Sequence, residues 1–322
     1  MDRRTWLGGG LCLLAAPLTI KAQSQRARIG FLGPREEPRF TETAAGLTRG
    51  LHEQGYDPAT VQLLRRRVGR GDMAEARAAI EALVQERADV LFVIGSVLAR
   101  LAREVAPALP IVFITPGDPV AGGLVVSLAR PGRNMTGLTF EYPELSGKRL
   151  ELLKELVPTI RRVLVLYDPR DTSPRQGMAA AREAAPRLGL SLVEREVRTP
   201  EDLTRALGGL AEADALLEIP GGLPSGHVAA MIRAAHARRV PTIFHAWTES
   251  TKDTLAAYGV SDADTAQEAA RLVAKILRGT NAGDLPVERP TKIRLVINLK
   301  TAKALGLTIP PSVLARADEV IQ

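Results

Sequence analysis

The strongest constraint on the fold of this chain is a repeated rhythm. A short apolar run rich in β-branched residues is followed by a few turn residues and then by a longer segment with helical spacing. This order is typical of βαβ units on a parallel sheet. In the first half the pattern predicts strands at 28–32, 61–68, 90–94 and 111–115, and helices at 39–54, 73–87 and 97–106.

The same rhythm restarts in the second half, so the two halves look like two copies of one α/β architecture. The predicted strands are 163–167, 191–197, 215–219 and 242–244, and the predicted helices are 174–188, 200–210 and 226–239. The halves meet at 134–143, which we interpret as an extended crossover or hinge leading into a helix at 143–157. A helix at 264–278, a strand at 293–297 and a short helix at 299–305 complete the pattern.

The first 22 residues have the order of parts of an export signal. Arg3 and Arg4 precede an apolar run at 6–18, and a cleavage-like ending follows at Ala22. The apolar run is too short to span a bilayer. The arginine pair also resembles a twin-arginine signal, while an ordinary secretory signal and a buried N-terminal helix are the alternatives. The signal predicts a mature protein in the periplasm.

Composition excludes several classes of function. Cys12, the single cysteine, lies inside the predicted signal, so the mature chain would have no disulfide and no thiolate ligand or nucleophile. Removing residues 1–22 removes three basic and one acidic side chain, which lowers the net charge from +7 to +5. The only dense basic run, 65–67, lacks the interleaved aromatics of a nucleic-acid groove. No later apolar segment is long enough to cross a membrane.

Polar residues at the predicted strand ends are candidate ligand contacts, because open parallel sheets bind ligands at the carboxyl ends of their strands. The Gly95-Ser96 turn opens a helix and could hold a carboxylate, or Ser96 could only cap that helix. Asp118 precedes Pro119 and is either a helix cap or a carboxylate at the mouth of a cleft. Asp168 ends the first strand of the second half in the same way.

Aromatic residues make up only 4% of the chain, yet many of them fall near strand ends. Tyr142 and Trp247 lie in predicted loops and are the better candidates for stacking on an organic ligand. Phe31, Phe113 and Phe244 lie in or beside strands, where a core position is the simpler interpretation.

Evidence for catalysis in the sequence is thin. The four histidines show no metal-ligand spacing, and neither a nucleophile elbow nor a phosphate loop is found. A loose dinucleotide-like pattern at 69–74 follows the second strand of its series, so an ordinary turn is the better interpretation. We therefore expect no catalytic residue, no metal and no cofactor. A secreted enzyme on a doubly wound fold and a receptor domain for a membrane sensor remain as alternatives.

Long stretches of the mature chain resemble the bacterial ABC-transporter substrate-binding proteins of the group that includes tryptophan and tyrosine uptake components. The most specific stretches are 111–120, 123–132, 134–138, 144–154, 286–292 and 296–307. The resemblance implies a type I periplasmic binding protein fold, with two Rossmann-like lobes of parallel strands joined by several crossovers. It divides the chain into a signal at 1–22, lobe 1 at 23–140 with about 260–285, and lobe 2 at 141–259 with about 286–322.

The resemblance also implies a function without catalysis: a periplasmic component of an ABC importer that captures an amino acid or related carboxylate by hinge closure. The expected partners are the membrane permease and its ATPase, and the expected state is a monomer. Ser96 would hold the ligand carboxylate, and Asp118 or Asp168 its amine. The full set of ligand-facing residues would be Gly33, Gly95, Ser96, Thr115, Asp118, Tyr142, Asp168, Pro220 and Trp247.

Overall fold

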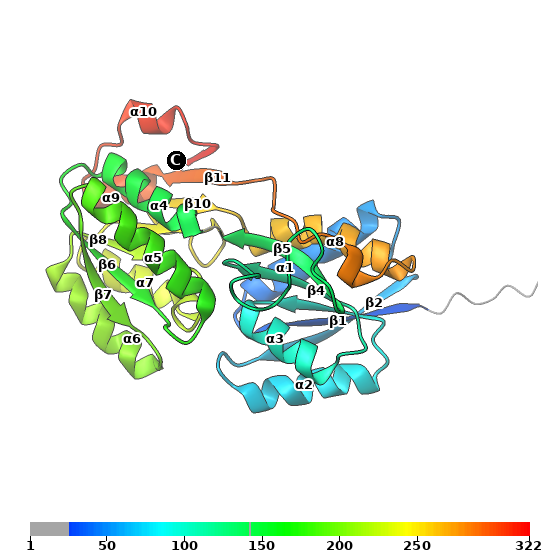
Figure 1. Cartoon of the computed structure of the whole chain (residues 1–322). Helices are drawn as coiled ribbons and strands as arrows, with labels where there is room; N and C mark the ends of the chain where they lie inside the picture. The colour runs from blue at the N-terminus through cyan, green and yellow to red at the C-terminus, as the bar shows by residue number, and fades with distance from the viewer. Residues whose placement is uncertain (1–25, 142) are drawn as a thin grey trace, which may run out of the picture.

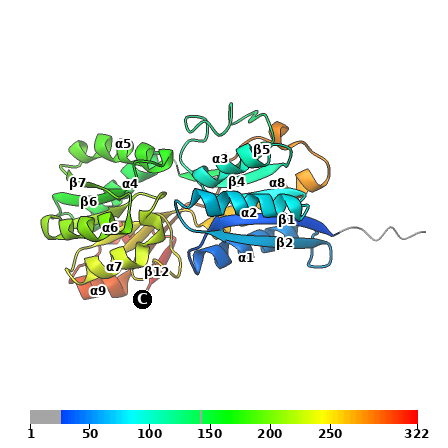
Figure 2. The same cartoon turned by 90° about the horizontal axis from the view of Figure 1, so that it is seen from below.

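The structure, a computed structural model, describes residues 26–141 and 143–322. The predicted signal at 1–22 and the candidate Tyr142 lie outside the described residues. Two α/β lobes lie side by side, as Figure 1 and the view from below in Figure 2 both show. The prediction of an α/β fold with two mostly parallel sheets is confirmed.

Lobe 1 is built on a five-stranded parallel sheet. Its strand order is β2-β1-β3-β4-β5, with bounds β2 (Val61–Val68), β1 (Ala27–Pro34), β3 (Val90–Ile94), β4 (Ile111–Pro116) and β5 (Met135–Glu141). Two apolar cores form, one on each face of the sheet. Helices α2 (Met73–Gln85) and α3 (Ser96–Val105) cover one face, and α1 (Arg39–Glu53) and α8 (Asp262–Leu277) cover the other.

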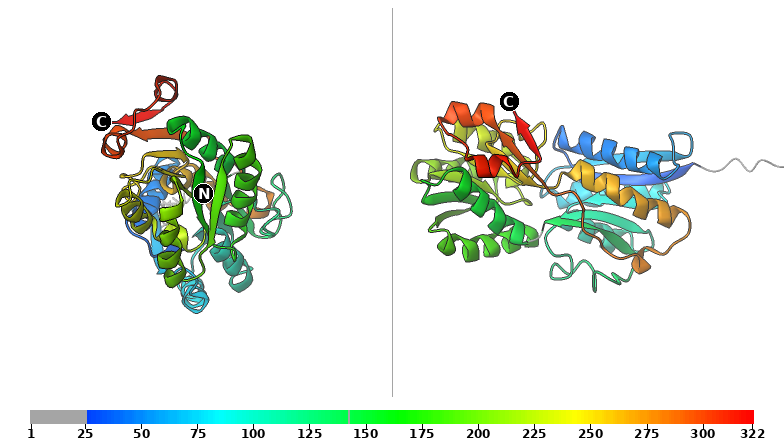
Figure 3. Two further views of the ribbon diagram at one scale, coloured as in Figure 1. Left: turned by 90° about the vertical axis from the view of Figure 1, so that its left-hand side faces the viewer. Right: turned by 90° about the horizontal axis from the view of Figure 1, so that it is seen from above.

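Helix α8 completes lobe 1 although it follows most of lobe 2 in the sequence. It packs along α1, as the right-hand view of Figure 3 shows. Two glycines of α1 make this close packing possible: a Cβ on Gly46 would lie 2.1 Å from the carbonyl oxygen of Ala263, and one on Gly50 would lie 2.2 Å from that of Gln267. Any larger residue at either position would push the two helices apart.

Lobe 2 contains a seven-stranded sheet in the order β12-β11-β10-β9-β8-β6-β7. Its strands are β6 (Arg162–Tyr167), β7 (Ser191–Glu196), β8 (Ala215–Glu218), β9 (Thr242–Phe244), β10 (Ala256–Gly259), β11 (Arg294–Asn298) and β12 (Glu319–Ile321). Helices α4 (Pro143–Leu156), α5 (Thr172–Arg187), α9 (Leu299–Leu305) and α10 (Pro311–Leu314) pack on one core. Helices α6 (Pro200–Ala206) and α7 (Val228–His236) pack on the other, with short 3-10 turns at Leu207–Glu212 and Pro224–Gly226.

The sheets depart from the predicted parallel arrangement at one place, where β10 and β11 pair antiparallel. Strand β10 leads the chain out of lobe 2 toward α8 of lobe 1, and β11 begins where the chain has come back, so the two strands must run in opposite directions. Strands β10 and β12 were not predicted, because runs of four and three residues are too short to show an alternating pattern.

The described chain passes between the lobes three times: from β5 to α4, from β10 to α8, and through residues 285–293 to β11. These crossings lie on one side of the cleft and leave the carboxyl ends of the parallel strands facing each other across it. Among the described residues, no helix combines the length and apolar character needed to cross a membrane.

Candidate functional site

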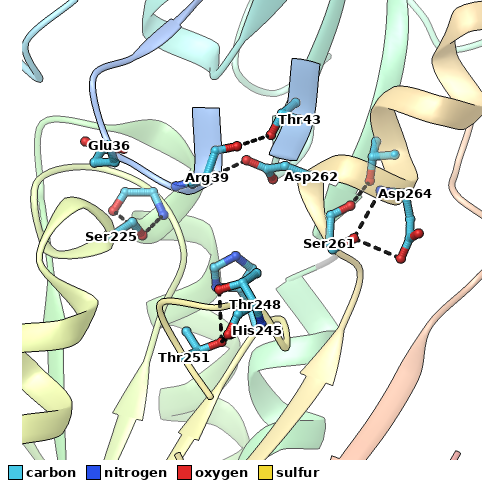
Figure 4. Close-up of polar contacts among 12 residues, drawn as sticks. Glu36, Arg39, Thr43, Ser225, His245, Thr248, Thr251, Ser261, Asp262 and Asp264 are labelled. Carbon is cyan, nitrogen blue, oxygen red and sulfur yellow. Dashed lines mark hydrogen bonds and ion pairs between the residues drawn. The ribbon is translucent and has the colours of Figure 1, made fainter. Parts of the chain in front are cut away.

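A cavity of about 520 Å³ lies between the two lobes at the carboxyl ends of their strands. Lobe 1 contributes residues from the loop after β1 and from the first turns of α1 and α8, and lobe 2 contributes the loops after β8 and β9. Figure 4 shows side chains from both lobes around this space. The lining includes Glu36, Arg39, Glu42, Thr43, Asp262, Ser225, His245, Trp247, Thr248 and Thr251.

The lobe 1 wall of this first cavity carries a buried ion pair. Arg39 and Asp262 are the first residues of α1 and α8, and the packing of those helices brings the Arg39 Nε within 2.5 Å of the Asp262 Oδ2. Asp262 is 5% exposed, and its other oxygen, Oδ1, has no hydrogen-bond partner among the described residues. Burial alone would lower the pKa of Arg39, but the charge and hydrogen bond of Asp262 outweigh it and raise that pKa.

The lobe 2 wall rests on a second buried carboxylate, Glu218 at the end of β8. Its Oε2 lies 2.7 Å from the His245 Nδ1, and its Oε1 accepts a hydrogen bond of 2.9 Å from the Ser225 hydroxyl. Burial would raise the pKa of Glu218, but the charge of His245, its hydrogen bond and the charge of Arg149 lower that pKa to about 2. Glu218 is therefore ionised, so His245 must donate from Nδ1.

This cluster does not form a nucleophile and base. The Ser225 hydroxyl donates to the Glu218 carboxylate and not to the His245 ring, and a carboxylate with a pKa of about 2 is too weak a base to activate a serine. The cluster instead fixes the orientation of the imidazole that lines the first cavity. Among the described residues, no group of three or more His, Cys, Asp and Glu side chains could hold a metal ion.

Three of the predicted site residues lie in a second, smaller space. Gly95, Ser96 and Asp168 line a cavity of about 330 Å³ between the lobes. The Ser96 hydroxyl donates to the Asp171 Oδ1 at 2.8 Å, so it joins the lobes directly. Ser96 is the first residue of α3 and its side chain caps no backbone group of that helix.

Asp168 is engaged within lobe 2. It is 3% exposed, and both of its oxygens accept from the Arg170 guanidinium, at 2.9 and 2.7 Å. Burial would raise the pKa of Asp168, but these hydrogen bonds lower it. The negative charge of Asp168 is thus already paired with the positive charge of Arg170.

Asp118 is exposed and makes local hydrogen bonds. Its Oδ1 accepts from the backbone N–H groups of Val120 and Ala121, at 2.8 and 3.2 Å. Its own N–H donates to the Gln176 Oε1 of lobe 2 at 2.8 Å. This is the capping arrangement that the sequence also allowed.

The other predicted residues occupy different places. Gly33, Thr115 and Pro220 are buried, and the Thr115 hydroxyl donates to the neighbouring Pro116 carbonyl at 3.0 Å. Trp247 is half-buried and, among the predicted residues that the structure describes, it alone lines the first cavity.

Sequence reasoning missed the two charged walls. Arg39 follows an unusually charged loop at 34–38, and Glu218 ends a predicted strand, so each had a local signal. Asp262 lies 223 residues from Arg39, and nothing in the sequence indicates that pairing.

The lobes also touch beside the second cavity, through what we call the interlobe contact: Ser96, Pro116 and Gly117 of lobe 1 with Asp171 and Ser173 of lobe 2. The Ser173 hydroxyl donates to the Pro116 carbonyl. A Cβ on Gly117 would lie 2.9 Å from the Ser173 Cα. The two lobes are therefore closed onto each other on this side.

Two α/β lobes with a cavity between their strand ends define a two-lobe solute-binding protein. The chain belongs to the family of ABC transporter substrate binding proteins, whose family model matches residues 28–321. It is a small-molecule-binding component of an ABC transporter.

The relatives are similar over most of their length. A conserved domain protein from Vibrio cholerae is 29% identical, with a TM-score of 0.84 over 92% of this chain and 100% of that one. An ABC domain from Streptococcus pneumonia in complex with L-Trp is 25% identical, with a TM-score of 0.83 over 92% and 100%. A tyrosine-binding protein of Clostridioides difficile is 25% identical over 84% of this chain and 79% of its own length.

Proposed function

We propose that this chain is the periplasmic receptor of an ABC importer and that it captures an amino acid or a related carboxylate in the first cavity. The single observation that carries this proposal is a cavity of about 520 Å³ walled by charged side chains from both lobes. Its size suits a small organic molecule. The tyrosine-binding and L-Trp-bound relatives support an amino acid as the ligand class.

Binding would act through closure of the two lobes. A ligand that touches Arg39 on lobe 1 and His245 or Trp247 on lobe 2 makes both sets of contacts only when the lobes are together. Such a ligand shifts the population toward the closed form. Trp247, half-buried in a loop at the cavity, would cover an apolar part of the ligand.

The closed form would then be presented to a membrane permease driven by an ATPase. We propose that the chain acts as a monomer, after export directed by residues 1–22, and that it has no catalytic activity of its own. The direct bonding of Ser225 and His245 to one carboxylate, with no nucleophile and base pair, supports that last point.

The test uses the mature chain, residues 23–322, in which Trp247 is the only tryptophan because Trp6 belongs to the predicted signal. The chain is titrated with the twenty amino acids and a set of small carboxylates, and Trp247 fluorescence and the heat of binding are measured. We expect a saturable fluorescence change with one group of amino acids or carboxylates. The proposal would be contradicted if no compound in the panel changed the fluorescence, gave a heat of binding or shifted the melting temperature.

A further inference from the structure

The lobe 1 wall of the first cavity contains a charged oxygen that the chain itself does not satisfy. The Asp262 Oδ1 is buried and has no hydrogen-bond partner among the described residues, while Oδ2 of the same carboxylate is bonded to Arg39. An ionised oxygen held away from bulk water without a donor is unfavourable. A ligand that brings a donor to this oxygen would therefore gain binding energy there.

The neighbouring arginine offers the opposite charge in the same wall. Its Nε is the only Arg39 nitrogen with a hydrogen bond to another described residue. The two terminal nitrogens are left to face a ligand, since Arg39 lines the first cavity. A guanidinium presents paired N–H donors that match the two oxygens of a carboxylate.

The charges around this pair favour a cation beside Asp262. Glu42 lines the same wall and feels the charge of Asp262, whereas Glu36 is already paired with Arg70. Burial raises the pKa of Glu42, and the carboxylates of Glu249, Glu37 and Asp262 add to that rise. A ligand amine would relieve this repulsion, whereas a plain dicarboxylate would increase it.

We propose that Arg39 and Asp262 form a zwitterion site: the Arg39 terminal nitrogens bind the carboxylate of an α-amino acid, and the Asp262 Oδ1 accepts from its ammonium group. The proposal rests on the proposed function and narrows its ligand class to solutes with both groups on one carbon. The guanidinium of Arg39 and the carboxylate of Asp262 lie side by side. An α-amino acid likewise carries a carboxylate and an ammonium group side by side, so each ligand charge can face the opposite charge of the pair. The ligand side chain then extends toward His245 and Trp247 of lobe 2.

The test compares three forms of one ligand on the mature chain. The first is the amino acid that binds most tightly in the panel above, and the others are its counterparts without the amine and without the carboxylate. For L-tryptophan these are indole-3-propanoic acid and tryptamine, and for L-tyrosine they are 3-(4-hydroxyphenyl)propanoic acid and tyramine. We expect the amino acid to bind at least tenfold more tightly than either counterpart in calorimetry.

Variants then assign the two groups to the two residues. Asp262→Asn should weaken amino-acid binding at least tenfold and change binding of the amine-free acid less than twofold. Arg39→Gln should show the mirror pattern, with the carboxylate-free amine affected least. Glu268→Gln, which removes a charge from the same helix outside the first cavity, should bind every form as the unchanged chain does.

Each other outcome has a defined meaning. Equal binding of the amine-free acid, or equal weakening of all three forms by Asp262→Asn, would overturn the zwitterion site and show that Asp262 is solvated by water or only supports α8. A panel in which only solutes without an α-amino group bind would also overturn it, while the proposed function stands. Absence of binding by any solute would contradict the proposed function, and the zwitterion site with it.

Discussion

The first cavity and the interlobe contact both lie between the lobes, but they are held together differently. At the cavity two charged pairs are partnered inside their own lobe: Arg39 with Asp262 in lobe 1, and Glu218 with His245 in lobe 2. A third pair, Arg294 of lobe 2 with Asp264 of lobe 1 at 2.8 Å, crosses between the lobes. In the interlobe contact the hydrogen bonds cross from one lobe to the other, as from Ser96 to Asp171. The walls built on the first two pairs are thus formed within each lobe, whereas the interlobe contact needs both lobes together.

This difference separates selectivity from closure. Groups fixed within one lobe meet every ligand in the same orientation, so they can discriminate between ligands. Hydrogen bonds between the lobes stabilise the closed form whichever ligand is present, so they add equally to every affinity. Substitutions in the cavity walls should therefore change the relative affinities for different ligands. Substitutions in the interlobe contact should instead weaken the binding of all ligands equally.

The largest effect is expected where a wall is built on a buried charge. Glu218→Gln removes a buried negative charge that accepts hydrogen bonds from His245 and Ser225 and lies near Arg149. We expect the free energy of unfolding of the ligand-free chain to fall by about 3 kcal/mol in chemical denaturation. Glu249→Gln, which breaks only the exposed pair with Lys252, should cost less than about 1 kcal/mol. Equal losses in the two variants would contradict a preformed lobe 2 wall.

The same carboxylate predicts a pH dependence. The pKa of Glu218 is about 2 in the folded chain against a usual 4.5, so folding favours its ionised form. Its contribution, on the order of 3 kcal/mol, is complete above about pH 4.5 and is lost as the pH falls toward 2. Between pH 6 and pH 2.5 the free energy of unfolding should fall less for Glu218→Gln than for the unchanged chain, as denaturation curves at several pH values would show. An equal fall in both chains would show that groups other than Glu218 cause the loss of stability in acid.

The next largest effect concerns closure. Gly117→Ala places a Cβ against the backbone of Ser173 in lobe 2, which cannot move without parting the lobes. We expect all ligands to bind roughly thirtyfold more weakly, a loss of about 2 kcal/mol. Gly123→Ala is the matched control, because Gly123 also has a positive φ but has no atom within 4 Å of the added Cβ.

A result in which Gly123→Ala weakens binding as much as Gly117→Ala would assign the effect to backbone strain at positive φ. The interlobe contact would then play no part in affinity.

A tenfold effect is expected from the aromatic side of the cavity. Trp247→Ala removes a half-buried ring that lines the first cavity, and the lost apolar contact is worth about 1.4 kcal/mol. The loss should be greater for ligands with large apolar side chains than for small ones, as calorimetry with L-tryptophan and L-alanine would show. A uniform loss would place Trp247 with the closing contacts and not with the selective ones.

The smallest effect is expected from Ser96→Ala. Loss of one interlobe hydrogen bond is worth about 1 kcal/mol, so every ligand should bind about fivefold more weakly with no change in rank order. The melting temperature of the ligand-free chain should change little, because only one hydrogen bond between two separately packed lobes is lost. A change in ligand preference would instead support the sequence-based hypothesis that Ser96 contacts a ligand carboxylate.

The local pattern of the sequence predicted most of the fold. Strand 90–94 and helix 299–305 match the structure to the residue, because each has a strong apolar period and clear end signals. Strand β10, with the sequence Ala-Ala-Tyr-Gly, has neither, and only its neighbours β9 and β11 make it a strand.

The candidate site was predictable only in outline. The predicted strand ends lie around the space between the lobes, and Trp247 lies at the first cavity. The Arg39–Asp262 pair depends on two helix starts that meet through tertiary packing, which no local pattern can indicate. The structure pairs Ser96 with Asp171 and Asp168 with Arg170, and the sequence around these residues does not distinguish a free polar side chain from a partnered one.

The late position of α8 in the sequence affects the order in which the two lobes can fold during synthesis. While a nascent chain ends before residue 262, the Gly46–Gly50 surface of α1 lacks α8 and Arg39 lacks its hydrogen-bonded partner Asp262. Lobe 1 is therefore finished after the first strands of lobe 2 have been synthesised, although it begins first. The ability to hold a solute arises only in the last fifth of synthesis, and no N-terminal fragment ending before α8 can carry it.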